Sequence, residues 1–165
     1  MAIVSKIDPE TAPAEVREAI RQHLEKGYKL TNEKLTLLHN VAAFEAIEEG
    51  SYAVDRELQR IVGERAANFF EYAISVQNEC LVCTTYFKKL LDSQGIDIHT
   101  FEFTEEEKLL MEYGQALAKD PRHIPGELMD RLRAKYDEEA LVVLTSMGIM
   151  MLANNYFNDI MEVEV

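Results

Sequence analysis

The chain has 165 residues, 47% of them apolar and 28% charged, which is the balance of a folded globular protein rather than of a disordered or fibrous one. This length suits one hydrophobic core, so we expect a single domain over residues 1–165. The formal net charge of −13 disfavours binding to nucleic acid and to anionic membrane surfaces.

The N-terminal segment Met1–Lys6 lacks the apolar core of a signal peptide. The longest apolar stretch, residues 141–153, is shorter than the span of a bilayer. We therefore expect a cytoplasmic protein with neither a membrane nor a nucleic-acid partner.

Helical signals begin near the N-terminus. A turn containing two prolines opens a helix that should end near Gly27, because glycine commonly follows the last turn of a helix. Thr31 can cap a second helix, in which apolar residues recur at helical spacing as far as Phe44. A wide apolar stripe then predicts one long central helix over residues 52–77.

The second half of the chain also predicts helices. Asn78-Glu79 interrupts the helical pattern, which restarts at Cys80 and continues to about Ser93, before Gly95. Cys80 should therefore lie at the start of a helix.

Three more helices complete the predicted fold. Thr104 and Glu107 have the spacing of a capping box for a helix that reaches Lys119. A short helix over residues 125–134 and a long one over residues 137–161 follow. Since no segment predicts a strand, the fold class should be all-α, a bundle of several helices.

The chain has two cysteines, which form the sequence Cys80-Leu81-Val82-Cys83. A disulfide across so short a loop adds little stability, and a reducing compartment would keep it open. A helix N-terminus lowers a thiol pKa, and a spacing of three residues places both sulfurs on one helix face. We interpret the pair as an attacking and a resolving thiol; two buried core cysteines are the alternative.

Neither a metal nor a resident cofactor is expected. A structural zinc site needs four ligands, and the sequence contains neither a second Cys-x-x-Cys nor a pair of histidines at ligand spacing.

Residues 68–87 resemble the core motif of the alkylhydroperoxidase D-like and carboxymuconolactone-decarboxylase family. That motif runs as a helix, a serine (Ser75), an asparagine (Asn78), and then Cys-x-x-Cys opening a second helix. Looser similarity covers residues 8–17, 37–40 and 137–158, and so most of the chain.

The resemblance implies an all-helical homo-oligomer, a dimer, trimer or hexamer, with the cysteines near a subunit contact. Methionines cover much of the predicted last helix, and a second subunit would bury part of that surface. Peroxidase members of the family reduce hydroperoxides with the cysteine pair, which an external dithiol then resets. Decarboxylase members act on a lactone acid and need not keep the cysteines.

The sequence departs from the peroxidase pattern at two positions. That pattern has a glutamate 12 residues before the first cysteine and a histidine four residues after the second, which together relay protons. This chain has Asn68 and Phe87 there, and neither side chain titrates. Phe87 also makes the site drier, which by itself raises a thiol pKa.

Four other residues are candidates for a substitute relay or for lining the site. Glu64 and Glu71 share roughly the helix face of Asn68. The hydroxyls of Tyr72 and Tyr86 could hydrogen-bond a thiolate. The alternative is that both glutamates are solvated or paired with Arg65 or Lys88.

General acid–base help typically contributes about 10²–10⁴-fold in rate, so loss of the relay would slow peroxide turnover while leaving thiol–disulfide exchange open. The sequence thus favours a Cys80/Cys83 thiol oxidoreductase, acting on a hydroperoxide or disulfide with an external dithiol reductant. A catalytically degenerate oligomeric binding or scaffold protein ranks second, and a carboxymuconolactone-decarboxylase-like lyase third.

Overall fold

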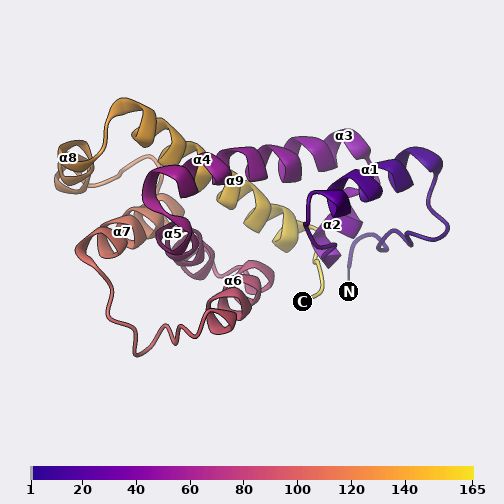
Figure 1. The fold of residues 1–165 in the computed structure, drawn as a ribbon, viewed down its shortest axis with the longest axis horizontal. Helices are drawn as coiled ribbons and strands as arrows, with labels where there is room; N and C mark the ends of the chain where they lie inside the picture. Colours follow the sequence, from indigo (N-terminus) through magenta and orange to yellow (C-terminus); the bar gives the residue numbers. More distant parts are fainter. Residues whose placement is uncertain (1) are drawn as a thin grey trace.

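The computed structural model describes residues 2–165, which form helices joined by turns and contain no strand (Figure 1). Met1, the first residue of the segment without a signal-peptide core, lies outside this range. The all-α prediction is confirmed. The elements in chain order are α1 (Ala14–Glu25), α2 (Asn32–Leu37), α3 (Val41–Phe44), the π-helix η1 (Glu45–Glu49), α4 (Gly50–Val62), α5 (Glu64–Gln77), α6 (Leu81–Ser93), α7 (Glu105–Lys119), α8 (Gly126–Lys135) and α9 (Glu138–Ile160).

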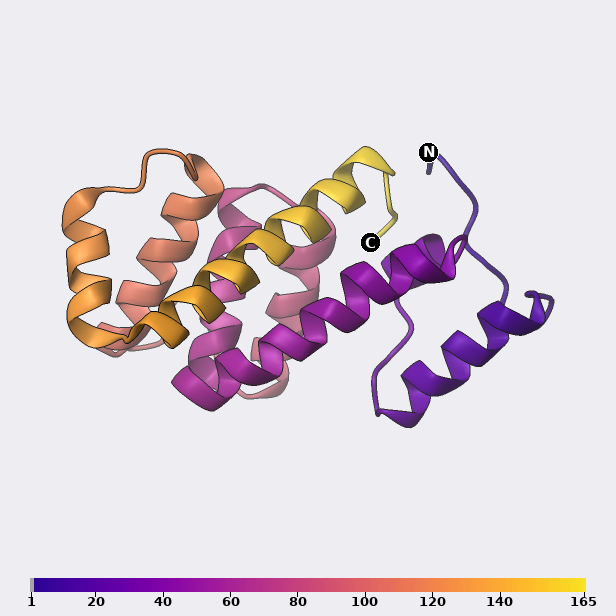
Figure 2. The same ribbon diagram turned by 90° about the horizontal axis from the view of Figure 1, so that it is seen from above.

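Helix α5 lies at the centre of the larger group of helices. It packs most extensively against α7 and also contacts α4, α6 and α9. Helices α4 and α9 run side by side in opposite directions, as Figure 2 shows. The main hydrophobic core lies between these elements and includes the fully buried side chains of Leu58, Phe70, Ile74, Leu110 and Leu144.

The predicted single helix over residues 52–77 is wrong. The structure divides it at Gly63, whose φ of 84° and ψ of 153° do not belong to a helix. Glycine adopts such a conformation readily because it has no Cβ. The apolar stripe continues through the break, since both α4 and α5 contribute to the main core. The periodicity of apolar residues therefore does not reveal the break at Gly63.

The N-terminal helices form a second core. The predicted helix from Thr31 to Phe44 is also interrupted: α2 ends at Leu37, and Asn40 caps α3 by accepting the N–H of Ala43 at 2.9 Å. Helix α3 then runs without a break through η1 into α4. Apolar residues of α1, α2 and α3 pack around Leu38 and Phe44 at this end.

The other predicted helix boundaries agree with the structure to within one or two residues. The Thr104–Glu107 capping box is formed, with both reciprocal hydrogen bonds present. Asp137 caps α9 by accepting the N–H of Ala140 at 2.9 Å. The N-terminal segment returns to the far end of α9, where the Ile3 N–H donates to the carbonyl of Met161.

Helix α9 has 23 residues and is the one helix in the described range whose length and composition would suit a membrane span. The expectation based on residues 141–153 therefore underestimates the length of this apolar helix. The core helix of a water-soluble protein meets the same criteria, and 39% of the most apolar window of α9 is buried against other helices. The exposed apolar side chains of α9 are Val142, Ile149, Tyr156 and Ile160.

Candidate functional site

The turn that holds the cysteines is a helix C-cap joined directly to a helix N-cap. Glu79 takes the left-handed conformation, with φ of 58°, and its N–H donates to the carbonyl of Val76. The N–H of Cys80 donates to the carbonyl of Ser75 at 3.1 Å. These two bonds are those of a Schellman motif, which commonly ends a helix with glycine at the left-handed position. The Asn78-Glu79 interruption is therefore confirmed, with Glu79 where glycine is usual.

Cys80 is at the same time the N-cap of α6. Its Sγ accepts the backbone N–H of Cys83 at 3.5 Å, the bond that a serine or aspartate oxygen makes at many N-caps. Both cysteines are free thiols, and their side chains lie close enough to hydrogen-bond each other. The prediction that Cys80 lies at a helix start beside Cys83 is confirmed.

The two thiols have opposite pKa shifts. The pKa of Cys80 is lowered by the hydrogen bond from the Cys83 thiol and by the backbone N–H groups of Cys83 and Val82, while burial opposes this shift. The pKa of Cys83 is raised by its bond to Cys80, by burial and by the negative charge of Glu33. In this arrangement Cys80 is the thiol that ionises first.

Both thiols are buried, with 0% of Cys80 and 6% of Cys83 exposed. Leu81, which follows Cys80 in the chain, is 66% exposed. The exposed Asp159 of α9 is close enough to hydrogen-bond the Cys80 thiol, although burial is the larger influence on its carboxyl and raises its pKa. A substrate would have to displace the side chains that bury the two thiols.

Buried amides of α9 form the inner wall of the site. Asn158 is 1% exposed, and its Nδ2 donates to the Cys83 Sγ at 3.3 Å. Asn155 is fully buried, with its Oδ1 3.5 Å from the hydroxyl of Ser75. The surroundings of the cysteines on this side are thus polar rather than apolar.

Glu64 does not belong to this site. It is exposed at the start of α5 and accepts a hydrogen bond from Gln94, which follows the last residue of α6. The cysteines lie beyond the opposite end of α5, a helix of 14 residues and therefore about 20 Å long. The proposed partner Arg65 instead pairs with Glu107 at 2.6 Å.

Glu71 is buried, but its neighbour is another carboxyl group. It hydrogen-bonds Asp55 of α4, and its Oε1 is a buried atom without a partner. Burial raises the pKa of Glu71, and the adjacent Asp55 raises it further, so the two groups hold a proton between them. Asn68 lies one turn earlier on α5, also buried, with an unpartnered Nδ2.

The aromatic candidates have different surroundings. Phe87 is buried in the main core and contacts the ring of Tyr86 edge-on. Tyr86 is 47% exposed; burial of its hydroxyl and then the charges of Glu71 and Asp55 raise its pKa. Tyr72 is partly buried and packs against apolar clusters, which assigns it to the core.

Sequence reasoning missed Glu33 and Asn158 as neighbours of the thiols. Glu33 comes from α2, early in the chain, and its charge raises the Cys83 pKa. Asn158 is the last residue of the 137–158 segment, which has only loose family similarity. No spacing rule links α2 or α9 to a motif between α5 and α6, because helix packing brings them together.

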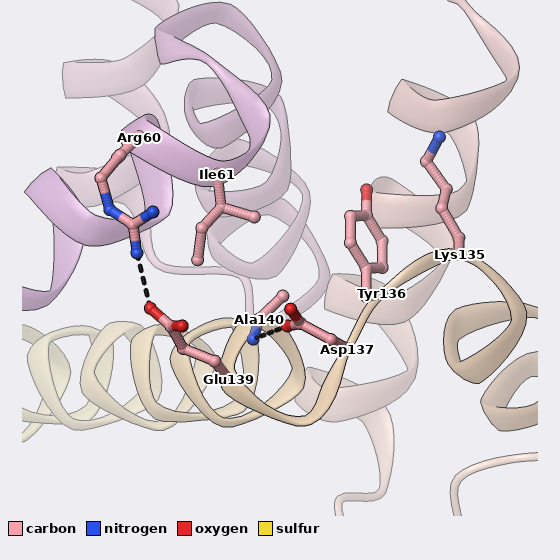
Figure 3. A pocket seen from close by; sticks show the side chains of 7 residues that line it. All are labelled: Arg60, Ile61, Lys135, Tyr136, Asp137, Glu139 and Ala140. Atoms are coloured by element: carbon pink, nitrogen blue, oxygen red, sulfur yellow. Dashed lines mark hydrogen bonds and ion pairs between the residues drawn. The ribbon is translucent and has the colours of Figure 1, made fainter.

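A separate hollow of about 330 Å³ lies where the end of α4 meets the turn between α8 and α9 (Figure 3). Its charged side chains already have partners: Arg60 pairs with Glu139 at 2.6 Å, and Lys135 with Glu106 at 3.4 Å. It holds no thiol, and it carries no functional assignment here.

No three histidine, cysteine, aspartate or glutamate side chains converge to hold a metal ion within residues 2–165. Comparison with known proteins does not assign the chain to a family, since no family model, no curated protein and no solved structure matches it.

Proposed function

We propose that the protein is a thiol oxidoreductase in which Cys80 and Cys83 reduce a hydroperoxide or a disulfide, a divergent relative of the alkylhydroperoxidase D-like family. The observation that carries this proposal is the placement of the Cys80 sulfur at the N-cap of α6, bonded to the Cys83 N–H and adjacent to the Cys83 thiol. A helix N-terminus and a Cys-x-x-Cys motif are two of the settings that lower a thiol pKa and make a cysteine reactive.

The reaction divides into two steps. The Cys80 thiolate attacks the terminal oxygen of the hydroperoxide, so that an S–O bond forms, the O–O bond breaks and the alkoxide takes up a proton. The Cys83 sulfur then attacks the sulfenic sulfur of Cys80. The S–S bond forms, the S–O bond breaks, and hydroxide leaves as water with a proton from Cys83. An external dithiol restores both thiols by exchange.

The buried position of the thiols predicts a slow reaction with bulky substrates. A small hydroperoxide requires a smaller displacement of the side chains that cover Cys80 than a bulky one does. A cytoplasmic location accords with two free thiols in a reducing compartment. The relay that the family places at positions 68 and 87 is absent, and this favours modest turnover.

We also propose that copies of the chain associate through α9. Its exposed apolar residues Val142, Ile149 and Tyr156 recur every seven residues along one face. Such a surface commonly packs against a partner, and symmetric self-association is the most frequent case. Light scattering coupled to size-exclusion chromatography measures the molar mass of the protein in solution. The mass of a monomer at micromolar concentration would contradict the proposal.

The test of the enzymatic proposal is hydroperoxide consumption with dithiothreitol supplied. The wild type should consume hydroperoxide, and Cys80→Ser and Cys83→Ser should each lose that activity. Lys89→Ser, on an exposed position of the same helix, is the matched control and should keep it. Equal rates in all four proteins would refute the proposal.

A non-catalytic binding or scaffold protein is the second candidate, and the burial of both thiols is the observation in its favour. It predicts cysteine pKa values in the ordinary range of about 8 to 9. A Cys80 pKa below about 7 would eliminate it.

A further inference from the structure

A carboxyl group from the N-terminal part of the chain reaches the cysteine pair. Glu33 lies in the first turn of α2, and its Oε1 is a buried atom that accepts no hydrogen bond. The buried amide of Asn158 connects it with the thiols: this amide lowers the pKa of the Glu33 carboxyl and donates to the Cys83 sulfur at 3.3 Å. An ionised carboxylate that is buried and incompletely bonded is costly, which favours the neutral acid.

We propose that Glu33 stores the proton of the cysteine pair, so that it is a neutral acid while Cys80 is a thiolate and a carboxylate once the disulfide has formed. This inference rests on the proposed redox function and adds to it a residue outside the Cys-x-x-Cys motif.

The groups that face Glu33 explain why it holds a proton. Burial is the main cause and raises the pKa of Glu33 to about 8; the charges of Glu48 and Cys80 add to the shift, while Asn158 and Lys34 oppose it. The titratable groups around Glu33 come from four elements and are Lys34, Glu48, Tyr52, Cys80, Cys83 and Tyr86.

The nearby cation does not neutralise Glu33. Lys34 points to Glu48, with Nζ and Oε2 3.5 Å apart, and also donates to the Tyr52 hydroxyl at 2.5 Å. Both Lys34 and Glu48 are buried, so this cation lies beside the Glu48 carboxyl inside the protein. The charge of Cys80 raises the Glu33 pKa, so the two negative charges repel each other, and this repulsion favours one negative charge at the site at neutral pH.

The proton balance of the cycle follows from this repulsion. In the reduced form the site holds one proton on Cys83 and one on Glu33, with the negative charge on Cys80. Attack on a hydroperoxide removes the charge from Cys80, and Glu33 gives its proton to the alkoxide. Cys83 then supplies the proton for the water that leaves as the disulfide forms. The external dithiol returns two electrons and two protons, one to Cys83 and one to Glu33.

Asp55 and Glu71 are the competing proton store, because they also hold a proton in a buried place. The charges of all three carboxyls act on Tyr86, and the charge of Glu33 also acts on Cys83. The two assignments are separable by substitution.

The experiment is a reduced-minus-oxidised infrared difference spectrum of the full chain at neutral pH, with thiol counts to verify each state. The C=O stretch of a protonated carboxylic acid should appear in the reduced form and disappear on oxidation. It should be lost in Glu33→Gln and kept in Glu45→Gln, an exposed carboxyl of η1. The wild-type spectrum tests the proposal even if Glu33→Gln does not fold.

Four results would overturn the inference. A disulfide that forms without any carboxyl band, or with a band that persists in Glu33→Gln, refutes the role of Glu33 and leaves the redox function intact. A band lost in Glu71→Gln instead assigns the proton to the Asp55–Glu71 pair. Thiol counts that never change refute the redox function, and the inference with it.

Discussion

Replacement of Glu33 by glutamine should change how the stability of the protein depends on pH. The Glu33 carboxyl has its pKa raised to about 8 in the folded chain, mainly by burial. In the unfolded chain it ionises near its ordinary value of about 4.3. Between these values the folded state holds a proton that the unfolded state has lost, so the free energy of unfolding falls as pH rises.

The magnitude follows from this difference. One proton contributes about 1.4 kcal/mol per pH unit, so from about pH 5 to pH 8 Glu33 lowers the stability of the wild type by at most about 4 kcal/mol. Glu33→Gln should match the wild type near pH 5 and exceed it at pH 8. Two other buried carboxyls with raised pKa values, Asp55 and Glu71, occur in both proteins and cancel in the comparison.

The assay is urea unfolding followed by far-UV circular dichroism at several pH values. Glu45→Gln is the control because its carboxyl is exposed. If the wild-type and Glu33→Gln curves run parallel from pH 5 to pH 8, Glu33 is ionised at neutral pH and the reasoning fails.

Three further predictions concern the thiols and the backbone. In the wild type, the Cys80 thiol should react with iodoacetamide at a lower pH than the Cys83 thiol, as peptide mapping of the labelled protein would show, since their pKa values shift in opposite directions; the reverse order would exclude Cys80 as the attacking group. Glu79→Gly should raise the free energy of unfolding by about 1 kcal/mol, because Glu79 has φ of 58°. Gly114→Ala should lower it by about 1–3 kcal/mol, because a Cβ there would lie 2.9 Å from the Phe70 carbonyl oxygen, whereas Gly126→Ala, with open space, should not.

Local signals predicted much of the fold. Thr104 with Glu107, and Asp137 before Ala140, are side chains that cap helices within one turn, so their spacing is sufficient evidence of a helix start. Asn78-Glu79 likewise marked the end of α5 correctly.

The errors arose where local pattern and backbone conformation disagreed. Gly63 breaks a stripe that is apolar on both sides, because α4 and α5 bury their apolar faces in the same core. A glycine inside a helical pattern is compatible with a helix, so only its φ of 84° identifies the break.

The sequence predicted the two cysteines of the site but not the residues that surround them. The N-cap position of Cys80 follows from the motif, whereas the contact of Asn158 with Cys83 depends on how α9 crosses the start of α6. The candidate Glu64 shares a helix face with Asn68. A shared face does not fix the position along the helix axis, and Glu64 lies at the start of α5, whereas the cysteines follow its end.

The central claim is that Cys80 and Cys83 interconvert between two thiols and one disulfide in the folded protein. Thiol titration with intact-mass measurement, after mild treatment with a small hydroperoxide under native conditions, tests this most directly. We predict that the wild type loses both titratable thiols without gaining oxygen, and that a dithiol restores them. Two thiols that persist through the treatment, or oxygen added to one cysteine with no bridge formed, would contradict the account.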